Sequence, residues 1–223
     1  MIMYKDDKQK IVISGINEYT NIQYFFTSNQ YELPLDKLSI SSNHQFSPKR
    51  LSDFSTGRYC AMKALEQIGI QNVIIPIGKN REPIWPEGIV GSISHCDTLT
   101  GAIVSRKADH ISLGLDIEEI GRVTADLWPY VFTDKEIEYL NTLPIDQQEL
   151  ICTSIFSLKE AFYKFQFPIT NLFLDFLDVE VQIPELNRMV VLSGLIPSSS
   201  LIHNNKLIVQ NYENTVISVI LSE

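Results

Sequence analysis

The chain has 223 residues, which is enough for one large domain or two small ones with a well-packed hydrophobic core. Its hydrophobic fraction of 44% and charged fraction of 20% are ordinary for a globular protein in water. The net charge of −9 argues against non-specific nucleic-acid binding, because affinity for a phosphate backbone needs a broad basic surface.

The apolar runs and the cysteines indicate the cellular compartment in which the protein is expected to work. No apolar run approaches the roughly 18 residues that a membrane helix needs, and residues 1–8 turn polar too early for a secretory signal. Cys60, Cys96 and Cys152 are odd in number and widely separated, which fits neither a disulfide framework nor a zinc site. We therefore expect a reduced, cytoplasmic protein without an integral membrane segment.

The first half of the chain combines one helix with several strands. Ser47-Pro48 is a typical helix start, and an apolar stripe from Leu51 to Ile68 predicts a helix that Gly69 ends. The prolines within residues 78–88 predict a loop. Runs of β-branched residues predict four strands, the middle two forming a hairpin, at residues 73–75, 89–94, 101–105 and 111–118.

The second half contains two helices. Capping-box spacing at Thr133 predicts a short helix over residues 133–140. Asp146 is expected to cap a longer helix over residues 146–166, which Pro168 ends. The core stripe of this helix repeats every three or four residues, at Ile151, Ile155, Leu158, Phe162 and Phe165.

Strand-like runs follow the long helix. They lie at residues 179–183, 189–192, 207–209 and 216–220, with a turn signal at 204–205. In each half of the chain, a helix is followed by strands that can pair as hairpins. This order of elements predicts an α+β fold with antiparallel sheets. No repeat is visible residue by residue, so the likeness of the two halves is inferred from the order of elements.

Two short acidic segments indicate the chemistry. Asp116 and Glu118 end a strand, where residues two apart project from the same face. Glu160 and Lys164 lie four apart on the long helix and off its apolar stripe, so they share one surface. If they converge, three carboxylates and a lysine suit Mg²⁺ holding a phosphate. Taken singly, each pair is also compatible with a solvated strand edge or a surface ion pair.

Basic residues gather in the first half of this acidic chain. They are Lys49, Arg50, Arg58, Lys63, Lys79 and Arg81. Exposed lysines and arginines are commonly no more than solvated charges, and composition alone leaves that alternative open. The unusual segment 81–96 contains Trp85, which either packs under a bound base or plugs the loop, and it ends in Ser94-His95-Cys96. His95 by itself is compatible with a satisfied core histidine.

Taken together, these segments resemble 4′-phosphopantetheinyl transferases of the two-lobed type, most closely the transferase component of enterobactin synthetase. The resemblance rests on Gly-Leu-Asp-Ile-Glu at 114–118, on Phe-Ser-Leu-Lys-Glu-Ala-Phe-Tyr-Lys at 156–164 and on segment 81–96, with support from 49–65. It implies an α+β fold of two similar lobes related by a pseudo-two-fold axis, each a small antiparallel sheet packed on a long helix. We expect the lobes to be residues 1–108, with the coenzyme A contacts, and 109–223, with the carboxylates.

The resemblance also implies a role for each matching residue. Asp116, Glu118 and Glu160 resemble the Mg²⁺ ligands, and Glu160 is metal ligand, general base or both. Lys164 matches the lysine beside the diphosphate of coenzyme A, where it stabilises or protonates the leaving phosphate. The other contacts to coenzyme A are implied for Ser94, His95, Arg50, Arg58 and one of Lys79 and Arg81.

The implied reaction transfers 4′-phosphopantetheine from coenzyme A to a serine of an acyl, aryl or peptidyl carrier protein and releases 3′,5′-ADP. Siderophore or other nonribosomal-peptide or polyketide synthesis is the implied setting. We expect a Mg²⁺-dependent monomer with its ligand between the lobes and the carrier protein docked on second-lobe residues beyond Gly121.

Two other classes compete with this interpretation. A metal-dependent nuclease would need Glu-x-Lys on a strand beside the aspartate and a basic face, and the sequence has neither. A non-catalytic module that binds coenzyme A or a nucleotide remains as the alternative. Such a module would keep the basic cluster without needing three convergent carboxylates.

Overall fold

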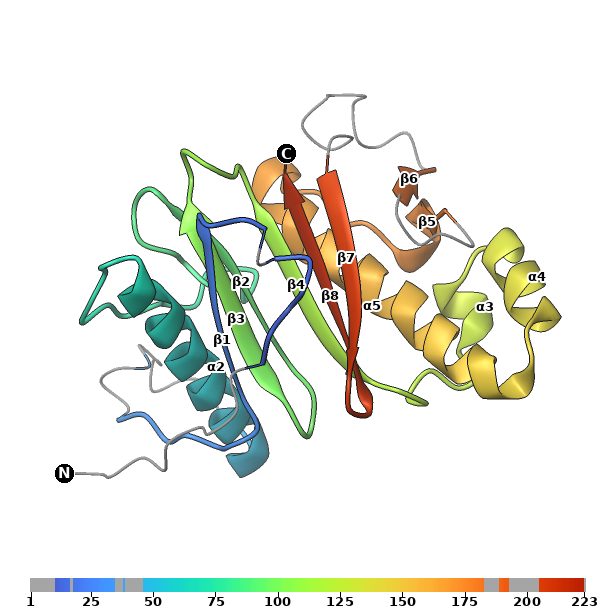
Figure 1. Ribbon diagram of the computed structural model, residues 1–223, viewed down its shortest axis with the longest axis horizontal. Helices are drawn as coiled ribbons and strands as arrows, with labels where there is room; N and C mark the ends of the chain where they lie inside the picture. The colour runs from blue at the N-terminus through green and yellow to red at the C-terminus, as the bar shows by residue number, and fades with distance from the viewer. Residues whose placement is uncertain are drawn as a thin grey trace.

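A computed structural model describes residues 11–16, 18–34, 38, 46–182, 189–192 and 205–222. Its strands form two three-stranded antiparallel sheets and one two-stranded ladder, and a long helix packs on each three-stranded sheet (Figure 1). This is the predicted α+β architecture. No helix within the described ranges is both long enough and apolar enough to cross a lipid bilayer.

The first half of the chain supplies the first sheet and its helix. Helix α2 (Pro48–Gln67) begins after Ser47, whose side chain accepts a hydrogen bond from the backbone N–H of Arg50. Just beyond the helix, Gly69 has φ 84°, the left-handed conformation that commonly ends helices. The strands of the first sheet are β1 (Ile22–Thr27), β2 (Ile89–His95) and β3 (Thr100–Arg106).

The second half supplies the other sheet and the longest helix. Its helices are α3 (Trp128–Val131), α4 (Asp134–Thr142), α5 (Ile145–Thr170) and the 3₁₀ turn η1 (Phe176–Asp178). Its strands are β4 (Leu113–Glu119), β5 (Val179–Val181), β6 (Met189–Val191), β7 (Asn205–Tyr212) and β8 (Thr215–Ser222). The short ladder pairs β5 with β6.

Both three-stranded sheets are built along the same path of the chain. In each, a first strand leads to the long helix and then to a hairpin whose second strand pairs with the first strand. The resulting strand orders are β1-β3-β2 and β4-β8-β7. The repeated topology accounts for the predicted likeness of the two halves, although the sequence carries no visible repeat.

The two sheets meet where β2 runs beside β4 (Figure 1). The backbone N–H groups of Leu115 and Ile117 in β4 donate to the hydroxyl oxygens of Ser92 and Ser94 in β2, at 2.9 and 3.3 Å. Because a buried N–H group without an acceptor is costly, these serines stabilise an edge of β4 that pairs with no other strand among the described residues.

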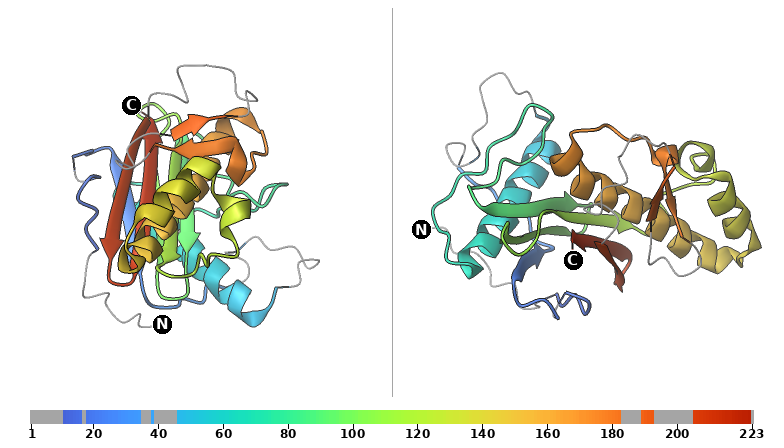
Figure 2. Two further views of the ribbon diagram at one scale, coloured as in Figure 1. Left: turned by 90° about the vertical axis from the view of Figure 1, so that its right-hand side faces the viewer. Right: turned by 90° about the horizontal axis from the view of Figure 1, so that it is seen from above.

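The described residues form three hydrophobic cores. One lies between α2 and the first sheet and another between α5 and the second sheet, and Figure 2 shows both helices on the same side of the strands. The opposite face of both sheets shares one core, which the segment 11–16 completes with the fully buried Ile13 and Ile16. The two halves are therefore packed together through a common core, and a boundary at residues 108 and 109 stays a prediction.

The predicted strand at residues 73–75 is wrong. The structure has no strand there, and only Ile77 forms an isolated bridge, with Pro83. Ile75 is buried, but Ile74 is 43% exposed, so this apolar run packs against the first core with one residue facing solvent and is not part of a sheet.

Both predicted ends of the long helix need correction. Helix α5 begins at Ile145 without a side-chain cap, and Asp146 lies in its first turn, where a carboxylate faces the positive end of the helix. Pro168 lies inside the helix, which continues to Thr170 and ends at Asn171 with φ 55°. Packing of the buried Phe165 and Phe167 keeps the last turn helical despite the hydrogen bond that proline cannot donate.

The other predicted helices and strands are confirmed, with small shifts at their ends. The capping box at Thr133 is present, and the core stripe of α5 is buried apart from the half-buried Ile151. The single turn α3 was not predicted, because it has no side-chain cap and is too short to show a period. Ile183 and Asn204, which the predictions assign to a strand and a turn, lie outside the described residues. The other residue of the predicted turn, Asn205, begins strand β7 and pairs with Ser222, so the turn prediction is wrong at this residue.

Candidate active site

A cavity of about 610 Å³ opens where α2, β2, β4 and α5 come together. All but one of the predicted site residues line it, namely Arg50, Arg58, Arg81, Ser94, His95, Asp116, Glu118, Glu160 and Lys164. Lys79, the exception, is exposed on the loop before Arg81. Acidic residues of the second half and basic residues of the first half therefore face one space.

Asp116 is the most buried carboxylate of this cavity, at 2% exposure. Its Oδ1 accepts from the Lys164 ammonium at 2.7 Å and from the Ser94 hydroxyl at 3.0 Å, and Lys164 also donates to Ser94 at 3.0 Å. Its Oδ2 is buried and has no hydrogen-bond partner among the described residues. A buried carboxylate oxygen left in this state is a candidate ligand for a cation.

Glu118 and Glu160 lie beside this aspartate. Burial, and next the charge of Asp116, raise the pKa of Glu118 from 4.5 to about 7, while Lys164 and Arg122 act to lower it. Burial likewise raises the pKa of Glu160, with Lys164 acting to lower it and Asp116 adding to the rise. The carboxylates thus repel one another, and a cation bound among them would favour their charged forms.

The three carboxylates do not form a finished ligand cage. Within the described part of the chain, no three histidine, cysteine or acidic side chains are grouped closely enough to hold a metal by themselves. Mg²⁺ commonly takes one or two carboxylates and completes its octahedron with water and substrate phosphate. The unpartnered Oδ2 of Asp116 and a donor set made only of carboxylate oxygens are suited to Mg²⁺ bound in this way.

Gly114 sets the distance between strand β4 and helix α5. A Cβ atom at this position would lie 2.9 Å from Cβ of Phe165 and 3.0 Å from the carbonyl carbon of Ala161, and closer still to the carbonyl oxygen. Only glycine therefore lets the two elements approach as they do. This approach places Glu160 on the helix opposite Asp116 on the strand.

Arg58 is the principal cation on the other side of the cavity. The residue is only 6% exposed, its Nε donates to the carbonyl oxygen of Ile75 at 2.9 Å, and its guanidinium lies 4.3 Å from the ring centroid of Phe54. Burial lowers the pKa of Arg58 to about 10. The ion pairs found among the described residues do not include Arg58. A buried guanidinium without a carboxylate partner is suited to binding an anion.

Two aromatic rings in this part of the cavity were not predicted from the sequence. The rings of Phe46 and Phe54 stack at 5.7 Å, and Arg50 lies 5.5 Å from the centroid of Phe46. Each arginine follows its phenylalanine by four residues, and this spacing is the only sequence signal for the two cation–π pairs.

Segment 81–96 contributes both to the cavity and to the core. His95 is exposed at the end of β2 and lines the cavity, so it is not a core histidine. Trp85 packs against Gly91 in the first core and does not line the cavity, which agrees with the role of a plug. Arg81 has φ 69°, an uncommon conformation for a residue with a side chain.

Comparison with known proteins identifies related sequences over both halves. A family model described as the 4′-phosphopantetheinyl transferase N-terminal domain matches residues 41–105. A second model, described as the 4′-phosphopantetheinyl transferase superfamily, matches residues 112–217. The two matches adjoin at the linker between β3 and β4, and together they include every residue that lines the cavity.

Three curated relatives show the extent of the similarity. The 4′-phosphopantetheinyl transferase Svp of Streptomyces mobaraensis is 37% identical over 137 residues, 61% of this chain and 56% of that protein. The 4′-phosphopantetheinyl transferase Npt of Nocardia iowensis is 35% identical over 133 residues, 60% of this chain and 59% of that protein. Enterobactin synthase component D of Salmonella typhimurium is 37% identical over 120 residues, 52% of this chain and 48% of that protein. The chain thus spans between about half and three fifths of the relatives it matches.

Proposed function

Because the chain belongs to the 4′-phosphopantetheinyl transferase superfamily, we propose that it transfers 4′-phosphopantetheine from coenzyme A to a carrier protein. The acceptor is a serine hydroxyl of an acyl, aryl or peptidyl carrier domain, and the second product is 3′,5′-ADP. Siderophore synthesis or another nonribosomal-peptide or polyketide route is the setting we propose, since the relatives include enterobactin synthase component D.

One observation carries this proposal. A single cavity is lined on one side by arginines, together with Asp53 that pairs with Lys49, and on the other by three carboxylates with a lysine. A module that only binds coenzyme A needs the cations to hold phosphates, but it gains nothing from buried carboxylates that repel the same phosphates. Carboxylates beside a phosphate site are useful where a divalent cation joins the two.

The basic side of the cavity is the proposed site for the donor. We assign Arg50, Arg58 and Arg81 to the phosphates at the adenosine end, because guanidinium groups make paired hydrogen bonds to phosphate oxygens. His95 and Ser94 are assigned to the phosphates nearer the carboxylates. Between the two candidates on the loop, the position of Arg81 at the cavity wall favours it over the exposed Lys79.

Asp116, Glu118 and Glu160 would hold Mg²⁺ at the other side. When bound, Mg²⁺ neutralises the diphosphate charge and aligns its oxygens for attack. Nζ of Lys164 lies 2.7 Å from Oδ1 of Asp116. We assign the same ammonium group to contact the diphosphate. The three carboxylates and the lysine are thus the charged groups that we place around the phosphorus atom that is attacked.

The chemical step forms a bond from the serine oxygen to the β-phosphorus and breaks the bond from that phosphorus to the bridging oxygen. Glu160 is proposed as a metal ligand, as the general base that accepts the serine proton, or as both. Lys164 is assigned to stabilise the leaving 3′,5′-ADP.

We also propose how the protein is organised and where it works. The lobes are residues 1–108 and 109–223, and the carrier protein docks at the mouth of the cavity, mostly on residues beyond Gly121. A monomer is proposed because one chain supplies both sides of the cavity. A cytoplasmic location is proposed because Cys60, Cys96 and Cys152 are all buried free thiols.

Binding and transfer, measured separately, test the proposed function. Calorimetry gives the affinity of the full chain for coenzyme A, and mass spectrometry follows an apo carrier domain incubated with coenzyme A and Mg²⁺. Tight binding together with a phosphopantetheine adduct supports the transferase. Tight binding without any adduct on several carrier domains supports the binding module instead.

A further inference from the structure

Three buried side-chain oxygen atoms have no hydrogen-bond partner among the described residues. They are Oδ2 of Asp116 in β4, Oγ of Ser157 in α5 and Oγ of Ser218 in β8. Asp116 is 2% exposed, and the two serines are fully buried. A buried polar group without a partner is costly, so each of these atoms needs an explanation.

Asp116 and Ser218 are neighbours across the second sheet. They are direct partners in the antiparallel ladder of β4 and β8, so their side chains project from one face with Cβ atoms about 4.5–5.5 Å apart. Helix α5 covers that face. A Cβ atom on Gly114, two residues before Asp116, would meet the carbonyl group of Ala161 in α5. Ile220, two residues after Ser218, belongs to the core between the sheet and the same helix.

Ser157 faces this layer from the helix side. Residues four apart lie on one side of a helix, and the residues four before and four after Ser157 both meet β4 or the turn that follows it. Oγ1 of Thr153 accepts from the backbone N–H of Gly121 at 3.4 Å, and Ala161 lies against Gly114. Ser157 therefore faces the acidic end of β4, which lies between these two contacts.

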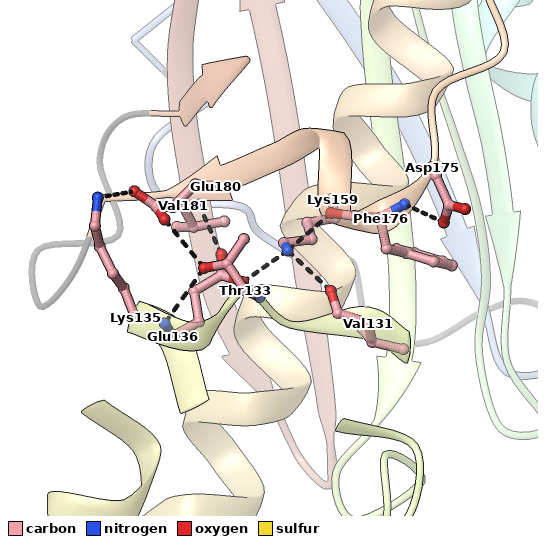
Figure 3. Close-up of polar contacts among 9 residues, drawn as sticks. All are labelled: Val131, Thr133, Lys135, Glu136, Lys159, Asp175, Phe176, Glu180 and Val181. Atoms are coloured by element: carbon pink, nitrogen blue, oxygen red, sulfur yellow. Dashed lines mark hydrogen bonds and ion pairs between the residues drawn. The ribbon is translucent and has the colours of Figure 1, made fainter. Parts of the chain in front are cut away.

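The buried ion pair of Lys159 holds α5 in this orientation (Figure 3). Its ammonium donates to Oε2 of Glu136 at 2.7 Å and to the carbonyl oxygens of Val131 at 2.9 Å and Phe176 at 3.0 Å. Residues two apart on a helix are rotated by about 200°, so Ser157 points away from this network. Rotation of α5 would break three hydrogen bonds of a buried charge, which keeps Ser157 against the sheet.

One water molecule can satisfy all three oxygen atoms. A buried water typically makes about three hydrogen bonds to polar groups that lack other partners. It can donate to Oδ2 of Asp116 and exchange hydrogen bonds with the hydroxyls of Ser157 and Ser218, each of which can donate and accept. Oδ1 of the aspartate is already engaged by Lys164 and Ser94, so Oδ2 is the oxygen atom that still needs a donor.

We propose that Ser157 and Ser218 bind one buried water molecule, which donates a hydrogen bond to Oδ2 of Asp116 and fixes the plane of this carboxylate. The two serines are then positioning residues, since they act on the reacting groups only through Asp116. An ionised carboxylate oxygen has two lone pairs, so Oδ2 can accept from the water and still bind Mg²⁺. The water site stands on the contacts above, whereas its effect on Mg²⁺ rests on the proposed function.

Thermal unfolding of alanine variants tests the water site without coenzyme A, Mg²⁺ or a carrier protein. If a serine hydroxyl has no partner, its removal should raise the melting temperature, because a desolvated polar group is lost. If both hydroxyls bind the water, Ser157→Ala and Ser218→Ala should each lower the melting temperature by about 2–4 °C. The double variant should lose less than the sum of the two, because both changes disrupt the same water.

Ser154→Ala is the matched control for Ser157→Ala. Ser154 is a buried serine of the same helix, but its hydroxyl donates to the carbonyl oxygen of Leu150 in the preceding turn, at 2.8 Å. The control shows what alanine does to α5 by itself, including its higher helix propensity, and it should not couple to Ser218→Ala. Additive losses in Ser157→Ala/Ser218→Ala, or a raised melting temperature in Ser218→Ala, overturn the inference.

A crystal structure of the full chain, at a resolution that shows ordered water, locates the water directly. We expect one water molecule within hydrogen-bond distance of Asp116 Oδ2 and of both serine hydroxyls in wild type. It should be lost in Ser157→Ala/Ser218→Ala. A well-ordered structure in which the hydroxyls bond to the carboxylate or to each other, with no water between them, refutes the proposed site.

Calorimetric titration with Mg²⁺, in the presence of coenzyme A, measures the positioning role. Groups that hold a metal-binding carboxylate typically contribute about 10–100-fold to metal affinity. We therefore expect Ser157→Ala/Ser218→Ala to weaken Mg²⁺ binding by at least about tenfold and Ser154→Ala to leave it unchanged. Wild-type Mg²⁺ affinity in a double variant that has lost the water rules out the positioning role. If the water is present and the two serines couple, but wild type modifies no carrier, the proposed function fails and the water site stands.

Discussion

Replacing Gly114 by alanine perturbs the contact that brings β4 against α5. The new Cβ would lie 3.0 Å from the carbonyl carbon of Ala161 and closer to its oxygen, and backbone atoms cannot rotate away. Restoring ordinary contact requires the strand and helix to separate by roughly 1 Å, and a misplacement of this size can cost about 10²-fold in rate. The overpacking itself should cost about 1–3 kcal/mol of unfolding free energy.

The expected signature of Gly114→Ala is a large loss in kcat with a smaller change in affinity for coenzyme A. The rate is measured by mass spectrometry of the carrier domain, the affinity by calorimetry and the stability by thermal unfolding. Gly101→Ala is the control, because its Cβ meets the ring of Phe26 in the first sheet, away from α5. It should lose stability but keep its rate. A folded Gly114→Ala protein with the wild-type rate would refute the argument that this close approach aligns Asp116 with Glu160.

Three further predictions concern single residues of the cavity. Asp116→Ala should abolish transfer while the fold persists by circular dichroism, and near-normal activity with Mg²⁺ in the folded variant rules out this ligand. Arg58→Ala should weaken coenzyme A binding by about 1.5–3 kcal/mol, much more than binding of a donor without the 3′-phosphate; equal losses in calorimetry move Arg58 away from that phosphate. Because the folded pKa of Glu118 is raised from 4.5 to about 7, its contribution to stability is full below 4.5 and is lost as pH rises through 7. Mg²⁺ must displace the proton that Glu118 binds below about pH 7, so the Mg²⁺ concentration for half-maximal activity should rise as pH falls. Glu118→Gln should remove this part of the pH dependence of thermal unfolding, and an identical profile contradicts the assignment.

Local sequence signals predicted much of the fold. Ser47 and Thr133 cap helices where their side-chain chemistry indicates, and the strands with β-branched runs lie within a few residues of their predicted ends. The failures have a common cause in tertiary packing. Residues 73–75 are apolar enough for a strand but have no neighbouring strand to pair with, and Pro168 stays helical because the aromatic residues around it are buried.

The same limit applies to the site. Spacing placed Asp116 beside Glu118 and Glu160 beside Lys164, because strand and helix geometry fixes those pairs. Spacing alone was unable to predict that Ser94 joins two sheets, since its partners lie 22 and 70 residues away along the chain. The contacts of Lys159 were equally impossible to predict from spacing. Its partners Val131, Glu136 and Phe176 come from three segments that only the folded chain brings together.

Transfer itself is the most direct test of the central claim. An apo carrier domain is incubated with the full chain, coenzyme A and Mg²⁺, and its intact mass is followed over time. The account predicts the gain of one phosphopantetheine on the carrier serine, with release of 3′,5′-ADP, and no gain when the chain or Mg²⁺ is omitted. A folded protein that binds coenzyme A tightly but leaves every tested carrier domain unmodified would contradict it.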